Sequence, residues 1–304
     1  MTWAAAGRGA TVSGRGAVRR MFARPLTLLM MVSLMWVMPA GAQARTDGPG
    51  AGRAETLYDL MAMPDLLGVM REEGLKLGAD MGEEYFPNRV ALGFDAVVQR
   101  IYDVSAMDEI MREAFVSGLL DLASDQEMTQ LIRFFRDGPG PRLVAAELTA
   151  RRAFLDNTVE TEAEARAPEI AGADPELAKL VEAYIAANDL IERNVSGALT
   201  ANYNFYLGLV DGGGYDVDDR QILSDVWEQE EATREESARW LRGYLFHAYG
   251  DVARSDLEAY VDLSQTDAGT LLNQVLFDSF GVLYNDIYRA LGLSISSLMT
   301  GEEL

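Results

Sequence analysis

Residues 127–143, with the sequence EMTQLIRFFRDGPGPRL, predict a short helix that ends abruptly and is followed at once by another. Met128, Leu131, Ile132 and Phe135 follow the i, i+3, i+4, i+7 spacing that places apolar side chains on one helical face. The glycines and prolines that follow Asp137 stop this helix, because glycine accepts a left-handed turn and proline cannot continue the hydrogen-bond ladder. This stretch therefore predicts a helical hairpin.

Local sequence signals mark where each of the two helices of this hairpin begins. Ser124 and Glu127 have the spacing of a capping box, in which each side chain bonds a free backbone amide of the helix start. Pro141 is suited to the first turn of the next helix, where its missing N–H costs nothing. We expect the first helix to begin next to Ser124 and the second to begin near Pro141.

The rest of the chain repeats the same helical spacing. Apolar residues recur at this spacing in residues 57–77, 94–122, 143–159, 177–210, 217–249, 257–263 and 271–291. No alternating apolar and polar run continues for six residues, as a half-buried strand would require. The sequence predicts an all-α, multi-helix bundle.

Parts of this pattern resemble a known family. Glu127-Met128, Phe134-Phe135 and Gly138-Pro139-Gly140 resemble the signature of the bacterial family called domain of unknown function 2059. That signature has Glu-Leu, then Phe-Tyr, then Ser-Pro-x-Gly, so the match is incomplete. Residues 57–67 resemble the family's opening helix, and the likeness extends from residue 57 to about residue 156. The resemblance implies an exported, all-helical protein and supplies no catalytic residues.

The N-terminal segment has the pattern of a secretory signal peptide. Arginines precede a thirteen-residue apolar stretch at 26–38, and Ala42 and Ala44 then form a small-residue cleavage site. The stretch is shorter than the ~20 residues needed to span a bilayer. We expect cleavage after Ala44 and a periplasmic mature chain with no transmembrane helix. Met21 offers an alternative start, which would make residues 1–20 an untranslated extension, while Arg19-Arg20 leaves twin-arginine export open.

Composition divides the remaining chain into four segments. Residues 45–54 are expected to be a flexible leader, 55–160 one helical half, 161–176 an acidic, proline-containing linker, and 177–304 a second half. Residues 103–113 are similar to 225–235, which favours a weak internal duplication. The capping-box pattern also recurs at Ser255 and Glu258, although two residues out of step with the apolar spacing.

The composition excludes several kinds of chemistry. The 304 residues include no cysteine and one histidine, which excludes disulfides, thiolate catalysis and multi-histidine metal sites within one chain. Removal of a signal peptide with five arginines leaves 21 basic against 48 acidic residues, a net charge of −27. Such a surface repels nucleic acid and anionic lipid. We predict no nucleic-acid partner.

Two polar motifs have residues that could form a site, but their patterns favour structural roles. His247 could act as a general base with Asp251. Its position near the C-terminal end of a predicted helix instead indicates that it stabilises the helix dipole. Asp211, Asp216, Asp218 and Asp219 surround a glycine-rich turn, yet their spacing does not match an EF-hand loop. We therefore predict no catalytic, cofactor-binding or metal-binding residues.

One helical face remains a candidate for a pocket. Asn188 and Asn202 fall at positions of an apolar stripe that runs from residue 184 to 209, with Tyr206 beside it. Buried amides need hydrogen-bond partners, which could be a neighbouring helix or a ligand. These three residues are the predicted pocket face.

These observations leave competing functions. The first is a non-enzymatic binding or scaffolding protein of the cell envelope, with an unknown protein partner or small ligand. This function fits a sequence whose motifs are explained by helix capping and by apolar helix faces. A hydrolase that acts on an envelope polymer or peptide needs only two carboxylates, which 48 acids easily supply. A peripheral membrane role for residues 291–299 is the third alternative, and the net charge argues against it.

Overall fold

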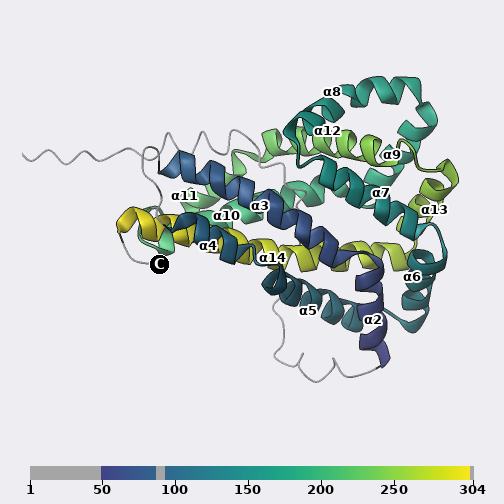
Figure 1. Ribbon diagram of the computed structural model, residues 1–304, viewed down its shortest axis with the longest axis horizontal. Helices are drawn as coiled ribbons and strands as arrows, with labels where there is room; N and C mark the ends of the chain where they lie inside the picture. Colours follow the sequence, from purple (N-terminus) through teal and green to yellow (C-terminus); the bar gives the residue numbers. More distant parts are fainter. Residues whose placement is uncertain (1–48, 87–92, 302–304) are drawn as a thin grey trace, which may run out of the picture.

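The computed structural model describes residues 49–86 and 93–301, which form helices and no β-strand, so the all-α prediction is confirmed. The helices, labelled as in Figure 1, are α2 (Pro49–Leu60), α3 (Met63–Tyr85), α4 (Phe94–Ile101), α5 (Val104–Leu122), α6 (Asp125–Asp137), α7 (Gly140–Ala153), α8 (Asn157–Ala173), α9 (Pro175–Ala187), α10 (Leu190–Asp211), α11 (Asp219–Trp227), α12 (Glu230–Tyr249), α13 (Arg254–Ser264) and α14 (Asp267–Thr300). The predicted signal peptide and its cleavage site at Ala42 and Ala44 lie outside the described residues. None of the described helices is both long enough and apolar enough to cross a membrane.

Helix α14 is the axis of the fold. It is 34 residues long, and Figure 1 shows it running through the middle of the molecule between helices from both halves of the chain. It packs against α4, α5 and α6 from the first half and against α10 and α13 from the second. One apolar core, which extends from Ala51 to Ile295, therefore joins the two predicted halves.

Glycine allows α10 and α14 to approach closely. A Cβ built at Gly208 of α10 would overlap the backbone oxygen of Arg289, and one at Gly292 of α14 would overlap the backbone oxygen of Phe205. Each helix thus has a glycine where the other's backbone lies. The absence of both side chains sets the distance between these helices.

The hairpin predicted from residues 127–143 is confirmed. Ser124 accepts from the backbone amide of Glu127, and the Glu127 carboxylate accepts from the amide of Ser124, which completes the capping box at the start of α6. Leu131 and Phe135 are fully buried, and α7 begins at Gly140 with Pro141 in its first turn.

Three local predictions differ from the structure. Residues 161–176, expected to be a linker, belong to α8 and the start of α9, and α8 packs along α12. Residues 49–54 of the expected leader belong to α2, because Ala51 and Ala54 are buried in the core. The second capping box does not form: α13 has Ala253 as its N-cap, with no capping side chain.

The apolar stripe from residue 184 to 209 was predicted to lie on one helix, but the structure divides it between α9 and α10. Asp189 has a left-handed backbone (φ 51°) and lies between the end of α9 and the start of α10. Short polar side chains such as aspartate tolerate this conformation better than most residues do. The break separates Asn188 from Asn202 and Tyr206 and places them in different surroundings.

Candidate functional site

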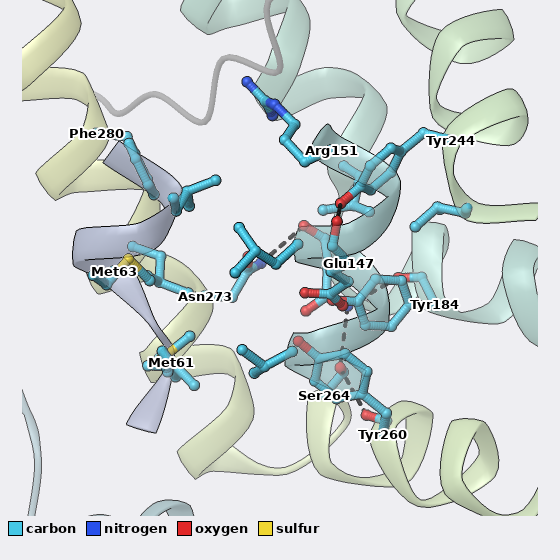
Figure 2. Close-up of a pocket in the computed structure, with 18 of the residues that line it drawn as sticks. Met61, Met63, Glu147, Arg151, Tyr184, Tyr244, Tyr260, Ser264, Asn273 and Phe280 are labelled. Carbon is cyan, nitrogen blue, oxygen red and sulfur yellow. Dashed lines mark hydrogen bonds between the residues drawn. The ribbon is translucent and has the colours of Figure 1, made fainter. Parts of the chain in front are cut away.

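A cavity of about 140 Å³ lies inside the bundle, between the α2–α3 junction and helices α7, α9, α10, α12, α13 and α14. Figure 2 shows its two unlike sides. Met61, Met63 and Phe280 lie on one side, and Glu147, Tyr184, Tyr260 and Ser264 lie on the other. A mainly apolar and aromatic lining with a few polar groups is usual for a small-molecule site.

Glu147, on α7, is the carboxyl group of the polar side. Its Oε1 accepts a 2.5 Å hydrogen bond from the hydroxyl of Tyr249, and its backbone oxygen accepts one of 2.8 Å from Tyr244. Burial raises the pKa of Glu147 from 4.5 to about 7, and the bond from Tyr249 only partly opposes this rise. Among the described residues, no basic side chain forms an ion pair with it. At neutral pH the group is therefore divided between its charged and neutral forms.

Arg151, one helical turn from Glu147, also lines the cavity but is already paired. Its Nε and a terminal nitrogen donate to the two carboxyl oxygens of Glu73 at 2.6 and 2.8 Å. Figure 2 shows the guanidinium turned away from Glu147. The residue is only 4% exposed, and Glu73 balances its charge.

The side-chain nitrogens of three buried asparagines in the cavity lining all donate hydrogen bonds to other groups of the protein. Asn188 donates to the backbone oxygen of Tyr184 and to the hydroxyl of Ser264, at 3.0 and 3.1 Å. Asn194 donates to the backbone oxygen of Leu190 at 2.6 Å, and Asn273 to that of Asn188 at 2.9 Å. The amide oxygens of all three accept no hydrogen bond from the residues that the structure describes.

The structure separates the predicted pocket residues. Asn188 lines the cavity, whereas Asn202 lies outside its lining and donates to Gln229 at 3.3 Å. Tyr206 also lies outside, with its ring 6.3 Å from that of Tyr215. Glu147 is not among the predicted pocket residues, although its position gives a signal: it lies four residues after the buried Leu143, on the same face of the helix.

The two motifs assigned structural roles have simple surroundings. His247 is exposed at the end of α12, with its ring 5.5 Å from that of Phe154. Asp211 bonds Arg289 at 2.5 Å, and Asp218 caps the start of α11. Within residues 49–86 and 93–301, no group of three or more potential metal-ligating side chains is assembled.

Comparisons of the chain with protein-family models, with curated proteins and with solved structures found no match. The resemblance to domain of unknown function 2059 stays a prediction. Any functional argument therefore depends on the geometry of the cavity.

Proposed function

We propose that this chain is an exported, non-enzymatic protein that binds a small ligand in the cavity between α7, α9, α12, α13 and α14. The observation that supports this most directly is the cavity itself, which combines an apolar wall with polar groups whose hydrogen-bonding capacity is unused. Its volume of about 140 Å³ is close to that of an engineered cavity, ~150 Å³, that holds benzene. The ligand would have on the order of six to eight non-hydrogen atoms.

The lining of the cavity does not favour the hydrolase alternative. Glycoside hydrolysis uses a pair of carboxyl groups on either side of the scissile bond. Of the described residues that line this cavity, Glu147 is the only acidic one, and both carboxyl oxygens of Glu73 accept hydrogen bonds from Arg151.

Export is supported by the sequence of the N-terminal segment. The apolar stretch at 26–38 followed by Ala42 and Ala44 has the order of a cleaved signal peptide. N-terminal sequencing of the protein from the periplasm of its native host should begin at Arg45. A soluble protein that retained Met1 or Met21 would contradict this part of the proposal.

Ligand binding can be tested with three probes of similar shape: benzylammonium, benzyl alcohol and benzoate. At least one should raise the melting temperature of the mature protein saturably, because a ligand that binds only the folded state stabilises it. Val144→Phe, which places a ring in the cavity lining, should abolish this effect. Thr149→Phe, on the exposed side of the same helix, is the matched control and should retain it. Failure of all three probes to bind would refute the proposed function.

A further inference from the structure

We infer that the ligand of this cavity is a small organic ammonium ion with an apolar body, held through its N–H groups by Glu147 and by the neighbouring amide oxygens. This inference rests on the proposed binding function and specifies its ligand class. It follows from the polar atoms of the lining that accept no hydrogen bond from the described residues.

The unused atoms of the asparagines are acceptors. Each amide nitrogen of Asn188, Asn194 and Asn273 faces a backbone carbonyl oxygen, which can only accept. Exchanging nitrogen and oxygen in any of these amides would bring two acceptors together, so the hydrogen-bond network fixes the orientation. A ligand that meets these three oxygens must therefore donate hydrogen bonds.

Glu147 supplies the complementary charge. Tyr249 occupies its Oε1, and its Oε2 accepts no hydrogen bond from the described part of the chain. An ammonium ion donates up to three hydrogen bonds and carries the positive charge that the half-buried carboxylate lacks here. Entry of the cation would favour the ionised carboxylate, so binding near neutral pH releases a proton from Glu147.

The other groups around Glu147 are compatible with a cation. Tyr184 of α9, Tyr244 of α12 and Tyr260 of α13 line the same cavity, and burial raises the pKa of each hydroxyl, so all three stay neutral. Phenol rings attract cations through their negative faces. Within the described part of the chain, Arg151 is the only basic residue of the lining, and Glu73 neutralises it. These residues therefore offer an anionic ligand no unpaired positive charge.

The opposite wall fits the apolar body of such a ligand. Met61 and Met63, at the α2–α3 junction, lie along it in Figure 2, and Met70 of α3 also lines the cavity. Methionine is unbranched and polarisable, so it adapts to apolar groups of varied shape. The ligand's nitrogen would thus face Glu147 while its hydrocarbon part contacts these side chains.

Calorimetric titration at pH 8 with benzylammonium, benzyl alcohol and benzoate tests this inference. Wild-type protein should bind benzylammonium at least tenfold more tightly than either of the others. Glu147→Gln should reduce this preference to below about twofold, because glutamine keeps the acceptor for Tyr249 but has no charge. Glu176→Gln removes a carboxylate from an exposed site on α9 and should leave the preference unchanged.

A second measurement does not depend on a variant. The affinity of wild-type protein for benzylammonium should fall about tenfold from pH 8 to pH 6, as Glu147 takes up its proton. Equal binding of benzyl alcohol and benzylammonium, or a preference that survives Glu147→Gln, would overturn the ammonium assignment and leave the binding function standing. Absence of binding by all three probes would overturn both.

Discussion

The hydroxyl of Tyr249, on α12, donates a 2.5 Å hydrogen bond to Oε1 of Glu147, on α7, across 102 positions of sequence. This bond stabilises the charged carboxylate, but burial favours the neutral acid more strongly. The folded protein therefore holds a proton on Glu147 up to about pH 7, while the unfolded chain releases it near the ordinary value of 4.5.

The first prediction follows from this difference. Between the two pKa values the folded state binds one more proton than the unfolded state, so the free energy of unfolding falls as pH rises. From pH 5 to pH 8, wild-type protein should lose about 2–3 kcal/mol relative to Glu147→Gln. Urea unfolding at both pH values measures this difference.

Comparison with the variant isolates Glu147 from other titrating groups. Burial raises the pKa of Glu236 to about 7 as well, but this residue titrates alike in both proteins. Parallel stability curves for wild type and Glu147→Gln would show that Glu147 has an ordinary pKa.

The second prediction concerns the buried pair of Arg151 and Glu73. Arg151→Met removes one partner and leaves a carboxylate that is mostly enclosed, which should cost about 3–5 kcal/mol. Adding Glu73→Gln to this variant should restore part of the loss, because no uncompensated charge then remains. Chemical denaturation of the two variants gives both values.

Arg152 is the matched control for that experiment. It pairs with Asp65 at 2.9 Å, but both side chains are more than half exposed. Arg152→Met should therefore change stability by less than about 1 kcal/mol. Equal losses for Arg151→Met and Arg152→Met would contradict the structural role of the buried pair.

The third prediction tests the close contact of α10 with α14. Gly292→Ala should destabilise the protein by about 1–3 kcal/mol or more, because the new methyl group would overlap the backbone oxygen of Phe205 and force the helices apart. Gly68→Ala is the control, since a Cβ at that position of α3 meets no atom within 4 Å. Gly68→Ala should stabilise the protein by about 0.5–1 kcal/mol. A lower melting temperature for Gly292→Ala and a higher one for Gly68→Ala would support the close contact of the two helices.

Local features were predictable from the sequence because neighbouring residues determine them. The apolar spacing from Met128 to Phe135 fixed one face of α6, and Ser124 with Glu127 fixed its start. The turn at Asp189 was missed, because a non-glycine residue in a left-handed conformation leaves no distinctive pattern in the sequence.

The cavity depends on contacts between distant parts of the chain, which the periodicity of a single helix cannot specify. Asn188 meets Ser264 across 76 positions, and Asn273 meets Asn188 across 85. Asn188 could be selected as a polar residue in an apolar stripe, but the stripe also selected Asn202, which bonds Gln229 elsewhere. Only the packing of α7, α9, α13 and α14 distinguishes the two.

The last prediction compares two serines with similar sequence surroundings. Ser124 and Ser255 both precede a glutamate by three residues, yet only Ser124 caps a helix in the structure. Ser124→Ala should cost about 1 kcal/mol, because the first turn of α6 loses a hydrogen bond to its free amide. Ser255→Ala should change stability by less than about 0.5 kcal/mol, because its exposed side chain lies inside α13 rather than at the cap. Urea unfolding of both variants decides the matter, and a loss at Ser255 equal to that at Ser124 would mean that Ser255, and not Ala253, is the N-cap of α13.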